Sequence, residues 1–408
     1  MSDESVAKSL LSAAAVRERA HKMLSLGDAL PNFRLDLGKL EATAQLVIDI
    51  TRAAYPTLDV PFHSRWRHFD IDGFDYWKEI DEAMAWPSPA ERSRTAMDLA
   101  IISVLLDAGA GPSWRFLYEV SGEYVTRSEG LALASLVMFR NCEFSKWPSY
   151  PLRVDGEILA ALTEDKLIKN FQVTAQNPLA GVAGRVALLR RLGETVLAKP
   201  EVFGIKDTPR PGGLFDHFAA LAENGKLAAP VILREVLTHL GPIWPSRLTL
   251  GGVALGDCWK HPAMKTGDAT NGLVPLHKLS QWLSYSLIEP LQWAGIEVTD
   301  IDGLTGLAEY RNGGLFIDTG VLTLRDPAAA ERSHTVDSEL VVEWRALTVA
   351  LLDRLADAVR TKLNMDRQSL PLARILQGGT WTAGRNVAKQ KRADGGPPLK
   401  IVSDGTVF

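Results

Sequence analysis

A carboxylate, a phenol and a guanidinium follow one another at Glu309, Tyr310 and Arg311. The surrounding residues predict a short helix that begins at Asp302 as its N-cap and ends at Asn312-Gly313-Gly314, where a left-handed C-cap forms easily. The three polar groups would then crowd the last helical turn, beside a glycine-rich backbone that a ligand can approach closely. The alternative is a capped helix whose last turn simply carries solvated side chains.

A second polar set lies in the helix predicted for residues 275–289, which buries a stripe of leucines. An adjacent face of this helix carries Lys278, Gln281, Trp282, Tyr285 and Glu289. A lone lysine on a helix is usually solvated, but one that shares its face with an amide, an indole and a phenol indicates the lining of a pocket. Lys278 is therefore a candidate ligand for an anion.

Cations and aromatic rings are mixed at residues 63–69, in the run His-Ser-Arg-Trp-Arg-His-Phe. Guanidinium and indole groups both offer flat faces, so Arg65, Trp66 and His68 are candidates for contact with a planar polar ligand. The following Asp-Ile-Asp-Gly-Phe-Asp run lacks the glycine and glutamate positions of an EF-hand loop. It predicts a tight turn that leaves Asp72 or Asp75 available to accept hydrogen bonds from a ligand. The alternative role of residues 63–69 is an arginine–aromatic stack that braces two helices.

Composition argues against several classes of function. The 408 residues carry 45 basic and 49 acidic side chains, so no extended basic surface for nucleic acid is expected. The two cysteines and eight scattered histidines show none of the common metal-ligand spacings, and we expect neither a metal nor another cofactor. The first apolar run is too short to span a bilayer and lacks a basic segment. We therefore expect a cytoplasmic protein without membrane contact. The composition does not argue against a small-molecule ligand that is an anion.

The apolar periodicity predicts a mainly α protein with a few short β-strands, because helical repeats dominate the sequence. The helices are expected at 5–26, 37–55, 90–106, 128–139, 159–169, 184–197, 214–222, 228–240, 275–289 and 336–364. Proline and glycine positions divide the chain into an N-terminal helical region, residues 1–200, and a C-terminal helical region, residues 201–368. The remaining residues, 369–408, are expected to form a tail that docks on the body.

Five segments resemble the uracil-catabolism (URC pathway) family of fungi and bacteria, over essentially the whole chain. They are HSRWRHF at 63–69, LLDAGAGPSWR at 105–115, RSEGLALAS at 127–135, GGTWTAG at 378–384 and SDGTVF at 403–408. The resemblance implies a place in a route that degrades uracil through ribosylated intermediates to urea. It does not by itself imply the chemistry of the step.

The C-terminal third is similar, more distantly, to the queuosine-salvage nucleotide N-glycosylases. Leu304-Thr305-x-x-Ala308-Glu309-Tyr310-Arg311 resembles their L-T-x-x-A-D-Y-R signature, and Lys278-Leu279-Ser280-Gln281 resembles their K-R-A-Q segment. Those enzymes have a helical fold akin to that of DNA glycosylases, and they hydrolyse the N-ribosyl bond of a nucleoside 5′-monophosphate. Glu309 stands where that family has an aspartate, so its carboxylate reaches one methylene further.

The two resemblances fit one chemistry, the hydrolysis of an N-ribosyl bond. This reaction passes through an oxocarbenium-like transition state, which a carboxylate can stabilise, or for which it can activate water, without a metal. The resemblance gives that role to Glu309. It also implies a 5′-phosphate held by Lys278 and Arg311, with Tyr310, Tyr285 and Gln281 as further substrate contacts. A planar leaving group such as urea would be recognised by Arg65, Trp66, His68 and Asp72.

The expected activity is therefore that of an N-glycosidase-type hydrolase of uracil catabolism, which cleaves a 5′-phosphorylated ribosylurea-type compound to urea and ribose phosphate. Two alternatives remain open. A metal-free amidohydrolase acting on a ureide would need a nucleophile, and neither Cys142 nor Cys258 has a visible base arrangement. A non-catalytic protein that binds a nucleotide or ureide, and regulates or scaffolds the pathway, would need no nucleophile.

Overall fold

The computed structural model describes residues 2–111, 113–148, 152–204, 208–244 and 248–402. The fold is mainly helical, which confirms the predicted class, and each sheet in these residues is a pair of short strands. Within the same ranges, no helix combines the length and the apolar character needed to cross a membrane. The terminal SDGTVF motif, and Pro112 of the motif at 105–115, lie outside the described residues.

The chain forms two compact units, and each unit combines segments that are distant in sequence. The first unit comprises Met1–His63, Ser246–Gln281 and Asp300–Phe408, and the second comprises Ser64–Pro245 and Trp282–Thr299. The sequence predicts a division in chain order, after residues 200 and 368. Apolar periodicity identifies an amphipathic helix but not the distant segment that packs on it, so it carries no information on this interleaving.

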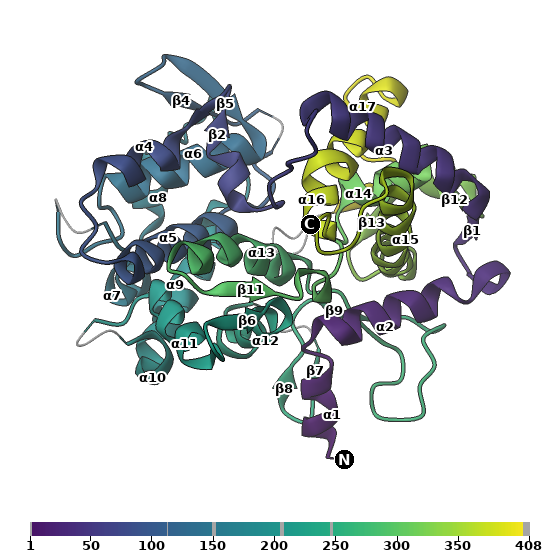
Figure 1. The fold of residues 1–408 in the computed structure, drawn as a ribbon, viewed down its shortest axis with the longest axis horizontal. Helices are drawn as coiled ribbons and strands as arrows, with labels where there is room; N and C mark the ends of the chain where they lie inside the picture. Colours follow the sequence, from purple (N-terminus) through teal and green to yellow (C-terminus); the bar gives the residue numbers. More distant parts are fainter. Residues whose placement is uncertain (1, 112, 149–151, 205–207, 245–247, 403–408) are drawn as a thin grey trace. The chain divides into compact units, whose positions relative to one another are not determined.

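The first unit is built around α15 (Glu339–Leu363), in which every residue from 340 to 352 is buried. A helix that is buried on all sides is a core helix. Two helices pack on α15, namely α2 (Ala13–Leu24) and α3 (Leu40–Ala54), and α17 (Trp381–Lys391) packs on α14 (Tyr310–Asp318) (Figure 1). The unit also contains α1 (Asp3–Ser9) and α16 (Leu372–Ile375), with a π-helical turn, residues 376–380, leading into α17.

The second unit has α5 (Pro89–Leu105) at its centre, with all residues from 95 to 105 buried. Three helices pack on α5: α6 (Arg127–Arg140), α9 (Val182–Ala198) and α11 (Leu214–Leu221). A further helix, α12 (Ala229–Leu240), packs on α9. The unit also contains α4 (Tyr76–Ala83), α7 (Gly156–Ala160), α8 (Glu164–Asn170) and α10 (Pro200–Phe203).

The strands of the described residues form seven separate pairs. In the first unit three pairs are antiparallel: β1 (Phe33–Leu35) with β12 (Leu322–Leu324), β7 (Thr249–Leu250) with β8 (Val253–Ala254), and β9 (Cys258–Lys260) with β10 (Leu273–Pro275). A fourth pair, β13 (Ser333–Thr335) with β14 (Lys400–Val402), is parallel. In the second unit β2 (Asp70–Ile71) pairs with β3 (Phe74–Asp75) and β4 (Arg115–Tyr118) with β5 (Glu123–Thr126), both antiparallel, and β6 (Lys226–Ala228) pairs with β11 (Glu297–Thr299) in parallel. Such short pairs orient loops between helices.

Capping residues divide two of the predicted helices. The helix expected at 5–26 is two helices, because the Ser12 hydroxyl accepts a hydrogen bond from the Ala15 N–H at 3.2 Å and starts α2. The helix expected at 159–169 is likewise two, because the Thr163 hydroxyl accepts one from the Lys166 N–H at 3.3 Å and starts α8. In both cases the apolar period continues through the break, so periodicity alone merges the helices.

The helix predicted for residues 275–289 is α13 (Lys278–Trp293), which starts three residues later and runs four residues further. Residue 275 still belongs to β10, and His277 has a positive φ of 46°, which separates the strand from the helix. Residues 278–281 of α13 belong to the first unit and residues 282–293 to the second.

The short helix expected between Asp302 and Asn312-Gly313-Gly314 is wrong. Residues 301–303 form one 3₁₀ turn, residues 304–309 are non-helical, and α14 begins at Tyr310 with Glu309 as its N-cap. The helix therefore starts at the three polar residues rather than ending there. The carbonyls at 302 and 304 instead accept hydrogen bonds from Arg17 Nη2, at 2.9 and 2.7 Å, which replace helical ones.

Close packing on α15 accounts for two glycines of this region, Gly306 in the segment before α14 and Gly313 inside α14. A Cβ on Gly313 would lie 2.7 Å from Cε2 of Trp344 and 2.8 Å from the hydroxyl of Thr348, both on α15. A Cβ on Gly306 would lie 2.6 Å from Leu352 Cδ1, also on α15. These glycines are therefore contact points with the core helix and not a chain terminator.

Candidate functional site

The Glu309 carboxylate is buried, with 8% of the residue exposed, and is fixed by the helix that it caps. One oxygen, Oε2, accepts the Arg311 N–H at 2.6 Å, and the other, Oε1, accepts the Asn312 N–H at 2.6 Å. These N–H groups have no partner within the helix and lie at its positive end. The carboxylate is therefore held in one orientation by backbone donors.

The segment that leads into Glu309 is held by two amide side chains. Gln281 donates from Nε2 to the Thr305 hydroxyl at 2.6 Å and accepts the Thr305 N–H at 3.2 Å. Asn312 donates from Nδ2 to the Leu307 carbonyl at 3.3 Å. Gln281 is fully buried, so these bonds fix the position of the segment, and its role as a substrate contact stays a prediction.

The ion pair of Arg345 and Asp257 contacts the backbone at Lys278 and at Ala308, the residue before Glu309. Arg345 binds Asp257 with two hydrogen bonds of 2.8 Å, and its Nε donates to the Ala308 carbonyl at 3.1 Å. Asp257 Oδ2 in turn accepts the backbone N–H of Lys278 at 2.9 Å. A planar, bidentate pair of this kind fixes geometry well. It therefore sets the start of α13 and the residue before Glu309 relative to each other.

The pKa values of Glu309 and Asp257 are shifted in opposite directions. Burial raises the pKa of Glu309, and this outweighs the opposing effects of the Arg311 N–H and of the Lys278 charge. Burial would also raise the pKa of Asp257, but the charge and hydrogen bonds of Arg345 outweigh it and lower that pKa well below its usual range. Asp257 is thus a permanent anion, whereas Glu309 is the carboxylate that protonates more readily.

His63 adds an imidazole to the electrostatic surroundings of Lys278. Its Nδ1 lies 2.9 Å from Oε1 of Gln377, the residue before the GGTWTAG motif, and its ring lies 6.5 Å from that of Trp381. Burial lowers the pKa of His63 to about 4; the Gln377 hydrogen bond opposes this, and the Lys278 charge adds to it. His63 is therefore a neutral imidazole near pH 7.

Arg311 and Tyr310 lie together at the start of α14. The Arg311 guanidinium is 4.9 Å from the centre of the Tyr310 ring, and its Nη1 donates to the Gly395 carbonyl at 3.0 Å. Its Nε is buried without a hydrogen-bond partner in the described residues. A Cβ on Gly384 would lie 2.2 Å from the Arg311 carbonyl oxygen, so α17 contacts the backbone here directly.

In the second unit, Arg65 and Trp66 are interior residues. Arg65 is fully buried; its Nε donates to the Ser103 hydroxyl at 2.7 Å and its Nη1 lies 3.2 Å from Asp107 Oδ2. Trp66 is also buried and donates from Nε1 to the Ser286 carbonyl at 2.8 Å. These contacts correspond to the alternative role given above for residues 63–69, in which arginine and aromatic side chains brace two helices.

The other predicted ligands of the second unit lie in different surroundings. His68 is buried with its ring edge toward Trp282, at 5.5 Å between centres, and Tyr285 is fully buried in α13. Asp72 is exposed, with a φ of 52°, in the turn between β2 and β3, which confirms the predicted tight turn.

The structure thus places one half of the predicted site residues in each unit. The first unit brings together Glu309, Tyr310, Arg311, Lys278 and Gln281, while Tyr285, Arg65, Trp66, His68 and Asp72 belong to the second. Four residues that the sequence did not single out act on Lys278 or on the residue before Glu309: Asp257, Arg345, His63 and its hydrogen-bond partner Gln377. Only the last two carry a sequence signal, because they lie in or next to segments with family resemblance.

Comparisons with known proteins cover the whole chain. The family model described as "Protein of unknown function (DUF1688)" matches residues 9–408. Protein urg3 of Schizosaccharomyces pombe is 40% identical over 422 residues, which cover 100% of both chains. Uracil catabolism protein 4 of Lachancea kluyveri is 36% identical over 409 residues, which cover 92% of each chain. These matches confirm the resemblance to the uracil-catabolism family, and the chain belongs to the DUF1688 family, whose model matches residues 9–408.

Proposed function

We propose that this protein is an N-ribosyl hydrolase of uracil catabolism, acting on a 5′-phosphorylated ribosylurea-type compound. The observation that carries the proposal is the Glu309 carboxylate, which is buried, held by two backbone N–H groups and within the electrostatic reach of Lys278. The place in uracil catabolism is supported by the name of the Lachancea kluyveri relative. The reaction type is supported by the resemblance of residues 304–311 to the N-glycosylase signature.

The proposed reaction exchanges one bond at the anomeric carbon. The bond from C1′ to the ureido nitrogen breaks, its electron pair leaves with the nitrogen, and positive charge develops on C1′ and the ring oxygen. The Glu309 carboxylate stabilises this charge and accepts a proton from the attacking water, whose oxygen bonds to C1′. The proton then reaches the leaving nitrogen, so the products are urea and ribose 5-phosphate.

Glu309 suits this role because its carboxylate is held in one orientation before the reaction begins. Two backbone donors hold its oxygens, so the carboxylate does not have to reorient as positive charge develops. Its low exposure reduces competition from bulk water, which strengthens the attraction to an oxocarbenium ion. Lys278 and Arg311 are the proposed phosphate ligands, and the Asp257–Arg345 pair is the group that keeps Lys278 in place.

Purified protein incubated with ribosylurea 5′-phosphate should release urea. Glu309→Gln should lower the turnover by roughly two orders of magnitude or more, because the amide cannot accept the proton of water. Glu309→Asp, which has the residue of the N-glycosylase signature, should retain more activity than Glu309→Gln. The matched control is Glu331→Gln, at a carboxylate that pairs with Lys400 and is 81% exposed; this change should leave turnover unaltered.

Helix capping alone is a competing explanation for Glu309, because both of its oxygens are bonded to its own helix. This observation favours the second candidate function, a protein that binds a ribosylated ureide without converting it. Binding measured by calorimetry, without urea release during a day, would support that function. Urea release that is equal in wild type and in a folded Glu309→Gln variant would remove Glu309 from the reaction.

A further inference from the structure

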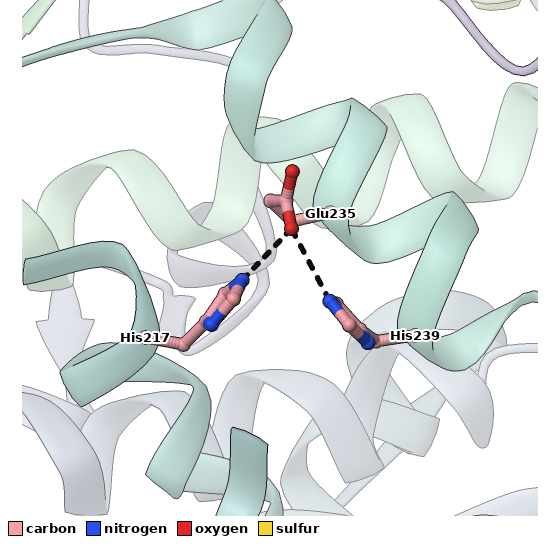
Figure 2. A group of neighbouring side chains, drawn as sticks. All are labelled: His217, Glu235 and His239. Atoms are coloured by element: carbon pink, nitrogen blue, oxygen red, sulfur yellow. Dashed lines mark hydrogen bonds and ion pairs between the residues drawn. The ribbon is translucent and has the colours of Figure 1, made fainter. Parts of the chain in front are cut away.

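Three side chains of the second unit turn their ligand atoms toward one another: His217, Glu235 and His239 (Figure 2). Glu235 and His239 lie four residues apart on α12, so they share one face of that helix, and His217 comes from α11. Glu235 Oε2 is 2.8 Å from His217 Nε2 and 3.2 Å from His239 Nε2. The ligand atoms of the three residues all lie within 4.8 Å of one another.

We propose that these three residues bind a divalent transition-metal ion, best matched by Zn²⁺, which links α11 to α12 and keeps one coordination position open. Two imidazoles and a carboxylate are suitable ligands for this ion. In a tetrahedral zinc site with bonds of about 2.0–2.1 Å, neighbouring ligand atoms are about 3.3 Å apart. The separations of 2.8 and 3.2 Å between Glu235 Oε2 and the Nε2 atoms of His217 and His239 are about 0.5 and 0.1 Å shorter than that spacing.

The surroundings of the cluster resemble those of a metal ligand set more than those of a surface ion pair. The exposed fractions of the side chains are 22% for His217, 11% for Glu235 and 17% for His239, so the cluster is shielded but still reachable. Arg234 donates from Nε to Glu235 Oε1 at 2.7 Å, which leaves Oε2 directed at the two imidazoles. An outer contact of this kind orients a ligating carboxylate.

Nearby charges limit the expected affinity. Arg234 is bonded to the carboxylate, and Lys199 donates from Nζ to the His239 carbonyl at 3.1 Å, so two cations oppose the ion. We therefore expect reversible binding that is weaker than in a four-cysteine zinc site.

The buried thiols do not compete for the ion. Burial raises the pKa of Cys142, and it raises that of Cys258 to about 12, so neither supplies a thiolate near neutral pH. The metal proposal also does not rest on the proposed hydrolase activity, because every ligand belongs to the second unit and the N-ribosyl reaction needs no metal.

The test is metal binding by the full chain after removal of bound ions with a chelator. Titration with Co²⁺ should give one equivalent per chain, with the visible absorption of a low-coordinate nitrogen and oxygen site, and Zn²⁺ should displace it. At a hundredfold excess of free Zn²⁺ over the dissociation constant, the midpoint of thermal unfolding of the 408-residue chain should rise by about 3 °C. His217→Gln and Glu235→Gln should each abolish the absorption.

His334→Gln is the matched control, because this histidine contacts only a backbone carbonyl, that of Ala329 at 2.7 Å, among the contacts of the described residues. It should leave the Co²⁺ absorption and stoichiometry unchanged. Equal Co²⁺ spectra in wild type and Glu235→Gln would overturn the proposal. So would a chain that binds no Co²⁺ although His217→Gln lowers its metal-free stability, because the cluster would then be a hydrogen-bond network only.

Discussion

The raised pKa of Glu309 has a consequence for the pH dependence of the proposed reaction. Burial raises this pKa above the ordinary value of 4.5, so the carboxylate is lost at a higher pH than in a free glutamate. Since the reaction needs the carboxylate, the turnover should fall as the pH drops through the raised pKa. The charge of Lys278 lowers the same pKa, and Lys278→Met should therefore move the midpoint to higher pH.

The pH profile of turnover measures both effects. Lys8→Met serves as the control, because Lys8 pairs with Glu4 in an exposed contact and should leave the midpoint in place. If the midpoint is the same in wild type and Lys278→Met, Lys278 does not act on the group that limits turnover.

His63 should make the protein less stable in mildly acidic solution. Its pKa is lowered to about 4, against 6.5 for an ordinary histidine, so between these values the unfolded chain binds a proton that the folded chain does not. The free energy of unfolding therefore rises with pH across this window, by up to about 3 kcal/mol from this group. Denaturant unfolding between pH 4 and 6.5 should show a flatter dependence for His63→Asn than for wild type. A slope that is equally steep in both proteins would exclude this origin.

At the scale of elements, α17 lies against the start of α14 through a glycine. A Cβ on Gly384 would lie 2.2 Å from the Arg311 carbonyl oxygen and 2.9 Å from its carbon, so Gly384→Ala must move one helix away from the other. Overpacking of this kind should cost about 1–3 kcal/mol of unfolding free energy. It should also lower turnover, because the moved backbone is bonded to Glu309.

The matched control is another helical glycine, Gly184 in α9, where a new Cβ meets no atom within 4 Å. Gly184→Ala should stabilise the protein by about 0.5–1 kcal/mol, because alanine loses less backbone entropy in a helix. Thermal unfolding of the two variants measures the difference. Similar midpoints for both would show that the α14–α17 contact tolerates a methyl group.

The sequence predicts which helices are present better than it predicts where each helix begins and ends. Periodicity finds most helices, including α5 and α15, because their apolar residues recur with the helical period. It places the end of a helix where α14 begins, because Gly313 reads as a terminator although it is a packing contact with Trp344. Rules based on neighbouring residues do not take account of Arg17, because it is distant in sequence. Its guanidinium binds the carbonyls of Asp302 and Leu304, which would otherwise accept hydrogen bonds within a helix.

The same reasoning explains which site residues could be found. Glu309 and Lys278 are recognised through local motifs, and the structure links them through Asp257 and Arg345. That ion pair joins residues 88 positions apart, and the His63 to Gln377 hydrogen bond spans 314 positions. Contacts of this kind depend on tertiary packing, which no local pattern in a single sequence encodes.

At the scale of the whole molecule, the chain passes between its two units at 63/64, 245/246, 281/282 and 299/300. The first unit therefore depends on segments from both ends of the sequence, whereas the second has most of its residues in one continuous stretch, residues 64–245. The C-terminal residues contribute core contacts to the first unit. Gly379 meets Val47 of α3 so closely that a Cβ would lie 2.4 Å from its Cγ1, and α17 packs on α14.

Removal of the residues from 372 onward should consequently unfold the first unit and leave the second folded. The truncation deletes α16, α17 and β14, and it exposes the buried faces of α3 and α14 to water. Hydrogen exchange followed by mass spectrometry should show lost protection in α15 and in α3, with protection retained in α5 and α9. Retained protection in α15 would show that the first unit stays folded without the C-terminal helices α16 and α17. Loss of protection in α5 would show that the second unit does not hold its fold alone, and either result would contradict the prediction.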